Sequence, residues 1–158
     1  MRTILIQYMN HPTPSQHILE TVARHLDGFD ARFTDGRRRL VEHLAESTGP
    51  RTPADLHASL AGRMPLSSLY RGLAVLEEAG VLSRHTGADG LSRYEIAERF
   101  VGHHHHLVCT ACGEMVDVAL GASAESAIGE VADNAASAAG YIASGHGLEI
   151  KGLCASCR

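Results

Sequence analysis

The four cysteines of this 158-residue chain stand as two CxxC pairs, Cys109–Cys112 and Cys154–Cys157. Two intervening residues let both thiolates of a pair point at one metal ion, and two such pairs usually close a tetrahedral sulfur cage around one zinc ion. A zinc ion with four thiolate ligands is saturated. We therefore expect this site to stabilise the fold and not to catalyse a reaction.

Four histidines, His103–His106, lead directly into the first CxxC pair. Side chains alternate between the two faces of a strand, so His103 and His105 should lie opposite His104 and His106. Imidazoles combined with carboxylates form sites that exchange metal, so the run indicates more metal-binding capacity than one structural zinc needs. An expression tag would also explain a histidine run, but this run is internal and only four residues long.

The composition limits the class of protein. Hydrophobic residues make up 44% of the chain, which is enough to bury a core, whereas aromatic residues make up 4% and tryptophan is absent. This scarcity argues against base-stacking platforms and large aromatic ligand pockets. No apolar run reaches the roughly 18 residues that span a membrane, so we expect a cytoplasmic protein without a membrane partner. Thiols stay reduced in the cytoplasm, which favours metal binding over disulfides.

The charges are distributed unevenly along the chain. Residues 31–71 contain seven arginines against four acidic residues, whereas residues 100–158 contain two basic and six acidic residues. A locally basic segment in an acidic protein suits a nucleic-acid contact on one lobe. An ordinary solvated helix face explains the same charge pattern equally simply.

Helical periodicity dominates the first half of the chain. After a loose arm over residues 1–14, we expect a helix over residues 15–28 and two more that begin behind N-caps at Thr34 and Thr52. A fourth helix carries leucines at helical spacing and is expected to be capped by Ser67.

Two extended stretches follow the fourth helix, at residues 81–86 and 91–96, and an Asp-Gly pair between them indicates a hairpin. Helices followed by a two-stranded wing predict a winged helix-turn-helix, whose last helix enters the major groove of DNA. We assign residues 15–97 to this DNA-binding domain and residues 98–102 to a hinge.

The remaining residues, 103–158, are expected to form a small α/β dimerisation domain. Strands are predicted at 104–109, 114–118 and 141–150, with an alanine-rich helix over 124–139. These strands give a three-stranded antiparallel sheet and an α+β fold class for the whole chain. Because so few strands make a poor core alone, we expect a homodimer.

The order of these features resembles the Fur (ferric uptake regulator) family of metal-sensing repressors. The resemblance covers residues 22–158, and its motifs are Ser68-Leu69-Tyr70-Arg71, HHHHLVCxxCG at 103–113 and GxCxxC at 152–157. Because the histidine run lacks an aspartate, it looks most like the zinc-uptake (Zur) branch. The resemblance implies a zinc-sensing repressor of metal-uptake genes, in which metal locks a dimer competent to bind double-stranded operator DNA.

The resemblance also implies three metal sites. The four cysteines match a structural zinc site. The residues that match a regulatory site for zinc or another divalent metal are His104, His106, Glu95 and Asp117. The residues that match a third site, within the dimerisation domain, are His103, His105, Glu125 and His146.

Some positions depart from the family pattern. Gly49-Pro50-Arg51 stands where many members place a ligand histidine, and Ala97 or Arg99 stands where zinc-branch sensors use a cysteine. The regulatory site is therefore expected to borrow another ligand. The candidates are His85, Glu98 and His17. At the third site Glu130 competes with Glu125, because the spacing from the first cysteine is shifted by one.

Residues early in the fourth helix are expected to contact DNA. They are Ser67, Ser68, Tyr70 and Arg71, which can reach phosphates or base edges from a recognition helix. Three consecutive arginines, Arg37, Arg38 and Arg39, should neutralise backbone phosphates and make binding salt-dependent. The alternative for both groups is a solvated helix surface.

Other functions stay open beside the zinc sensor. A sister sensor of iron, manganese, nickel or peroxide would differ only at the regulatory ligands. A zinc enzyme would need an open coordination position and a general base, and the chain has no HExxH or comparable motif, so we expect no enzyme. A thiol redox protein would use a CxxC pair, and its cysteines would react while zinc is present.

Overall fold

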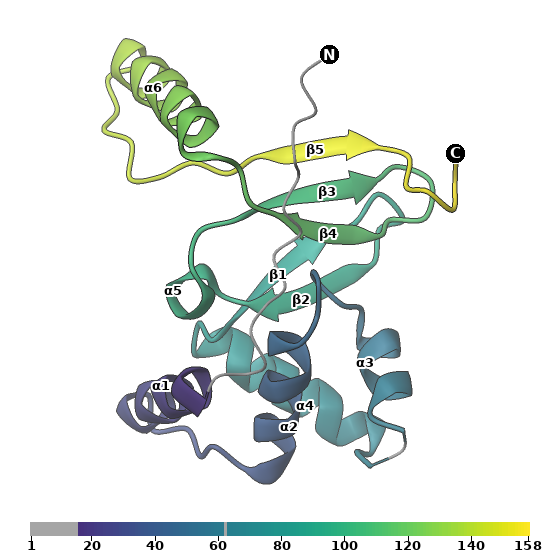
Figure 1. Ribbon diagram of the computed structural model, residues 1–158. Helices are drawn as coiled ribbons and strands as arrows, with labels where there is room; N and C mark the ends of the chain where they lie inside the picture. The colour runs from purple at the N-terminus through teal and green to yellow at the C-terminus, as the bar shows by residue number, and fades with distance from the viewer. Residues whose placement is uncertain (1–15, 62) are drawn as a thin grey trace.

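The computed structural model describes residues 16–61 and 63–158, so the expected arm over residues 1–14 lies outside the described residues. The N-terminal half is helical and the C-terminal half contains a β-sheet, which confirms the α+β class (Figure 1). The helices of the first half are α1 (Gln16–Gly28), α2 (Asp35–Ala45), α3 (Pro53–Ser59) and α4 (Leu66–Glu78). Next come β1 (Leu82–Thr86), β2 (Ser92–Ile96) and α5 (Glu98–Val101). The chain ends with β3 (His105–Cys109), β4 (Met115–Val118), α6 (Ala122–Ala138) and β5 (Glu149–Gly152).

Local capping determines where two of the helices begin. The Thr34 hydroxyl accepts a hydrogen bond from the Arg37 backbone N–H, and Thr52 forms a capping box with Asp55. The expected cap at Ser67 is wrong. The Pro65 carbonyl already accepts hydrogen bonds from the N–H groups of Ser68 and Leu69, so α4 starts before Ser67 can cap it.

The N-terminal core lies between the four helices and the β1–β2 hairpin. Its members are mostly leucines and valines at helical spacing, and burying each leucine stabilises the fold by roughly 1.5–3 kcal/mol. The largest fully buried apolar residues are Val22, Leu26, Leu40, Val41, Leu56, Leu69, Leu73, Leu76 and Val81. The hairpin is antiparallel, with Arg84 opposite Tyr94. Because Leu82 and Ile96 belong to this core, the hairpin and α4 form one packed unit.

The second sheet has the strand order β4–β3–β5. β4 pairs with β3 in antiparallel fashion, but β5 is parallel to β3, so the prediction of an all-antiparallel sheet is wrong. A parallel pair needs a long crossover, which α6 and the segment after it provide. The expected strand over residues 141–150 is reduced to its end, and Tyr141 and Ile142 are exposed.

α6 extends away from the sheet to which it is joined (Figure 1). None of its described residues is buried, and Val131 on its apolar stripe is 68% exposed. Within the described part of the chain, no helix is both long enough and apolar enough to cross a membrane.

The turn after α2 connects the helical half to the second sheet. The Asp117 N–H of β4 donates a 2.9 Å hydrogen bond to the Thr48 carbonyl. Gly49 packs directly on β4, because a Cβ at this position would stand 2.9 Å from Val116 Cα and would also collide with the Met115 carbonyl. This contact holds β4 against the N-terminal unit.

Candidate metal centres

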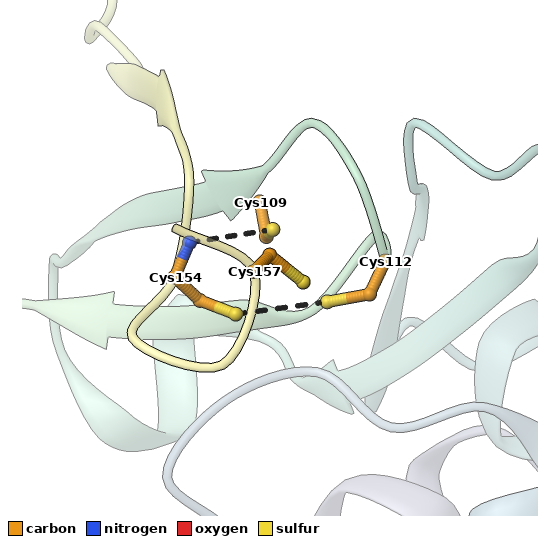
Figure 2. Close-up of side chains that lie close together, drawn as sticks. All are labelled: Cys109, Cys112, Cys154 and Cys157. Atoms are coloured by element: carbon orange, nitrogen blue, oxygen red, sulfur yellow. Dashed lines mark hydrogen bonds between the residues drawn. The ribbon is translucent and has the colours of Figure 1, made fainter.

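The four cysteines come together from the end of β3 with the turn after it and from the C-terminal loop, and their sulfurs face a common point (Figure 2). All four Sγ atoms lie within 4.8 Å of one another, and Cys112 Sγ is 3.8 Å from Cys154 Sγ. A tetrahedral zinc site with 2.3 Å bonds has sulfurs about 3.8 Å apart. The Cys154 backbone N–H also donates to Cys109 Sγ at 3.4 Å. We call this group the cysteine cage.

The thiols of the cysteine cage differ in pKa. Hydrogen bonds from backbone N–H groups, that of Cys112 first, lower the pKa of Cys109 to about 6. The neighbouring thiols, Cys154 first, raise the pKa of Cys157 to about 12. The hydrogen bond with Cys157 lowers the pKa of Cys154, but burial and the other neighbouring thiols raise it above its usual value, so a cation is needed to hold these sulfurs together as thiolates. The donor set therefore fits a zinc ion.

A second group of ligand atoms lies at the junction of the two halves. Glu95 of β2 meets His104, His106 and Asp117, and all four residues are buried. The Nε2 atoms of His104 and His106 are 3.2 and 3.0 Å from Glu95 Oε2, and 3.9 and 3.6 Å from Asp117 Oδ1. We call this group the inner cluster. Its donors are spaced like those around a small divalent cation, whose ligand bonds are about 2.0–2.2 Å.

The Glu95 carboxylate is the anionic centre of the inner cluster. Burial alone would raise its pKa, but hydrogen bonds from His104, His106 and His85 outweigh burial and hold the pKa of Glu95 far below its usual value. The hydrogen bond to Glu95 also raises the pKa of His104 to about 9. His104 is thus protonated at neutral pH in the metal-free protein, and a metal ion has to displace that proton.

His85 lies beside the inner cluster. Its Nε2 atom is 2.7 Å from Glu95 Oε1, the oxygen that faces away from the other two imidazoles, and its ring centroid is 4.8 Å from that of His106. A cavity of about 550 Å³ adjoins this place, and its lining includes His85, Glu98 and Glu149. Of the three candidates for an additional ligand, His85 is the one whose side chain contacts Glu95.

Neither of the other two candidates belongs to the inner cluster, although Glu98 lines the same cavity as His85. Glu98 Oε1 is 3.1 Å from His103 Nδ1, so this carboxylate faces the third group of ligands. His17 is exposed on α1. Gly49 lies in the turn Gly49-Pro50-Arg51, where the family resemblance would place a ligand histidine. Its tight contact with β4 leaves no room for a side chain, a constraint that no sequence signal indicated.

The third group lies on the opposite face of β3. His105 Nε2 is 3.0 Å from Glu125 Oε1, while His146 and His103 are 3.3 and 3.7 Å from Glu125 Oε2. Glu125 belongs to this group of ligand atoms, whereas Glu130 is exposed on α6. We call this group the outer cluster. The alternation of side chains along β3 separates it from the inner cluster, as strand geometry requires.

The residues expected to contact DNA lie at two places on the helices. At the start of α4, Ser67, Tyr70 and Arg71 are exposed and Ser68 is half-buried. On α2, Arg38 and Arg39 are exposed, with Arg38 stacked 4.7 Å from the Phe33 ring centroid. Arg37 is half-buried and donates to the Arg32 carbonyl, so its guanidinium is already engaged.

Comparison with known proteins identifies the family. The sequence model of the Ferric uptake regulator family matches residues 29–151. The Peroxide operon regulator of Bacillus subtilis (strain 168) is 30% identical over 144 residues, which cover 89% of this chain and 94% of that protein. A zinc-bound manganese uptake regulator superposes with a TM-score of 0.64 at 26% identity, covering 87% of this chain and 98% of that one. The Helicobacter pylori ferric uptake regulator Fur has the same fold, with a TM-score of 0.68, 24% identity and coverage of 89% and 91%. The chain therefore belongs to the ferric uptake regulator family.

Proposed function

We propose that this protein is a metal-responsive, DNA-binding transcriptional repressor whose sensing site is the inner cluster. One observation carries the proposal: Glu95 belongs to the β1–β2 hairpin, whereas His104, His106 and Asp117 belong to the second sheet and its entry. A metal ion bound by all four side chains links the two halves of the chain. The conformation that gathers these ligands then gains the binding free energy of the metal, which shifts the population toward it.

The same donor set limits which metal ions suit the inner cluster. Two imidazoles and two carboxylates suit iron(II) and manganese(II) as well as zinc, and no cysteine is left over for a softer site. The relatives described above carry the names of peroxide, manganese and ferric uptake regulators. We therefore propose a sensor of iron or manganese, with the zinc sensor suggested by the histidine run as the alternative that a metal titration distinguishes.

The other two groups receive simpler roles. We propose that the cysteine cage binds a structural zinc ion, since four sulfurs at tetrahedral spacing leave no open position. We propose that the outer cluster binds a further divalent metal ion and joins β3 to α6 through Glu125, with the start of the sheet supplying His103 and His105.

DNA binding is proposed for the N-terminal unit. α2, α3 and α4 followed by the β1–β2 hairpin have the order of a winged helix-turn-helix, with α4 as the recognition helix. Tyr70 is 53% exposed beside the exposed Arg71, and this pair lies on the face of α4 opposite the core. Side chains placed this way can reach base edges once α4 lies in the major groove.

Dimerisation is proposed through the uncovered parts of the second domain. α6 buries none of its described residues, and β5 is an edge strand whose Ile150 is 43% exposed. Edge strands and exposed apolar helices need cover, and a second copy supplies it symmetrically. A dimer would present two α4 helices, whose separation must match successive turns of DNA.

The first experiment is a fluorescence-anisotropy titration. The wild-type protein is mixed with labelled DNA from its own upstream region, and buffered iron(II), manganese(II), zinc and nickel are added separately. Metal-dependent binding is expected, with iron or manganese acting at the lowest concentration. Activation by zinc alone would favour the zinc sensor, and binding that ignores every metal would contradict the proposal.

Two substitutions make this experiment specific. His104→Ala removes an inner-cluster ligand and should abolish the metal response, while His17→Ala removes an exposed imidazole on α1 and serves as the matched control. The zinc bound by the cysteine cage should stay the same in both variants, because the cage is untouched. An unchanged response in His104→Ala would exclude the inner cluster as the sensing site.

A further inference from the structure

A closely packed ion pair joins the turn of the β1–β2 hairpin to strand β2. The two terminal nitrogens of Arg93 each donate a 2.8 Å hydrogen bond to the Asp89 carboxylate, one to each oxygen. The Leu91 N–H donates to the same carboxylate at 3.1 Å. The Arg93 side chain is only 8% exposed and that of Asp89 only 23%. Charged side chains in a hairpin turn are usually solvated, so another part of the protein covers this pair.

The covering element is the loop of the cysteine cage. A Cβ built on Gly113, the residue after Cys112, would stand 2.5 Å from Asp89 Cγ, so the carboxylate rests directly on the Gly113 backbone. Gly113 has a φ of +72° and its N–H donates to the Cys109 carbonyl at 3.0 Å. On the other side, a Cβ at Gly87 would collide with the Arg93 guanidinium. The ion pair thus lies between two glycines.

Charge connects the pair to the cage as well. The hydrogen bonds to Asp89 raise the pKa of Arg93 above its usual value, so this guanidinium stays charged. A zinc ion with four thiolates carries a net charge of about −2. Arg93 is therefore near two anionic groups, the Asp89 carboxylate that it contacts and the cage beyond that carboxylate.

We propose that the Asp89–Arg93 pair seats the hairpin on the Gly113 loop of the cysteine cage, so that an intact cage helps to position the DNA-binding unit. The proposal rests on zinc occupying the cage, as proposed above, and gives that zinc a role beyond folding its own domain. Because the hairpin shares its core with α4, whatever fixes the hairpin also fixes α4. Loss of zinc from the cage would then alter the position of the DNA-binding surface without involving the inner cluster.

The arrangement of charges predicts unequal effects for the two members of the pair. Arg93→Gln leaves the Asp89 carboxylate facing an anionic cage, so repulsion adds to the lost hydrogen bonds. Asp89→Asn leaves the Arg93 cation beside the cage, so one attraction survives. A mere local turn contact would make the two substitutions similar, because each removes the same ion pair.

The test uses the full-length zinc-loaded chain, and hydrogen–deuterium exchange is followed in peptides that cover residues 87–91 and 109–113. The matched control is Arg84→Gln, which removes another arginine of the same hairpin and its solvent-accessible ion pair with Glu77 of α4. In Arg93→Gln we expect exchange to accelerate by about tenfold in both peptides, with a smaller increase in Asp89→Asn and none in the control. Zinc content should stay unchanged in all three variants.

DNA affinity gives the second readout. Arg93→Gln should weaken binding by about tenfold at saturating sensing metal, and Arg84→Gln by much less. Unchanged exchange at residues 109–113 in Arg93→Gln would overturn the contact, and faster exchange with wild-type DNA affinity would overturn its role in positioning α4. If Arg93→Gln fails to fold, Asp89→Asn provides the test. Unchanged exchange at residues 109–113 in that variant would overturn the proposal. The exchange measurement needs neither DNA nor a sensing metal, so its failure is distinguishable from failure of the sensor proposal.

Discussion

His85 Nε2 lies 2.7 Å from Glu95 Oε1, while His104 and His106 contact the other oxygen of the same carboxylate. The position of His85 therefore fixes the rotation of Glu95 and turns Oε2 toward the inner cluster. Groups that hydrogen-bond a metal ligand orient it and often change metal affinity by 10–100-fold. We infer that His85 acts by positioning Glu95 and does not itself bind the metal.

Substitution of His85 separates these two roles. His85→Ala should weaken metal binding at the inner cluster by about 10–100-fold, whereas His85→Gln, which keeps an N–H donor, should lose about threefold or less. Affinity is measured by competition with a fluorescent chelator, and the cobalt(II) absorption spectrum reports the ligands. Equal losses in both variants together with an altered cobalt spectrum would show that His85 is a ligand.

Gly49 offers a test of the contact between the two halves. A methyl group at this position has no room against Val116 and the Met115 carbonyl, so Gly49→Ala should lower the free energy of unfolding by about 1–3 kcal/mol. The control is Gly28→Ala, because a Cβ at Gly28 meets no atom within 4 Å. Urea denaturation measures both variants. A fully stable Gly49→Ala protein would show that β4 and the Thr48 turn separate easily.

The proposed DNA contacts differ in kind and should differ in behaviour. Arg71→Ala removes a guanidinium at the start of α4 and should cost about 1–3 kcal/mol of DNA-binding free energy if it contacts a base. Arg38→Gln should weaken binding to all sequences and reduce the salt dependence by about one phosphate contact. Anisotropy titrations at several salt concentrations distinguish the two effects. Wild-type affinity in Arg71→Ala would remove this residue from the interface.

Zinc removal tests the cysteine cage. Cys112→Ser should lose the tightly bound zinc and destabilise the second domain by several kcal/mol, because metal binding contributes directly to folding. Ser156→Ala, an exposed position in the same pair of loops, serves as the control. Zinc analysis and thermal unfolding provide the measurements, and a stable zinc-free variant would contradict a structural role. With zinc bound, all four wild-type cysteines should resist a thiol reagent, whereas a redox pair would react at once.

Local sequence signals predicted much of this architecture. Thr34 and Thr52 mark helix starts because each side chain caps the N–H group three residues further along the chain, a relation contained within a few residues. The alternation of the histidine run likewise predicted two opposite side-chain groups on β3, and the structure places them so.

Relations between distant segments could not be predicted in this way. The parallel direction of β5 depends on how α6 leads the chain back. Tyr141 has a strand-forming composition around it but no partner strand among residues 16–61 and 63–158. The Asp-Gly pair at Asp89 indicated only a turn. Its contact with Gly113 joins residues 24 positions apart, and nothing local to either residue signals it.

The histidine run should tolerate the deletion of one residue, because its four residues are identical. Slipping a strand by one residue moves each side chain to the opposite face, which normally destroys a ligand set. The pairing of β3 with β4 is anchored downstream, where Val108 and Cys109 are buried. Deleting one histidine would therefore leave imidazoles at the positions of His104, His105 and His106, and only the place of His103 would pass to glycine. Because the four residues are identical, a single-codon deletion in the run keeps both imidazoles of the inner cluster. Only the outer cluster loses a ligand.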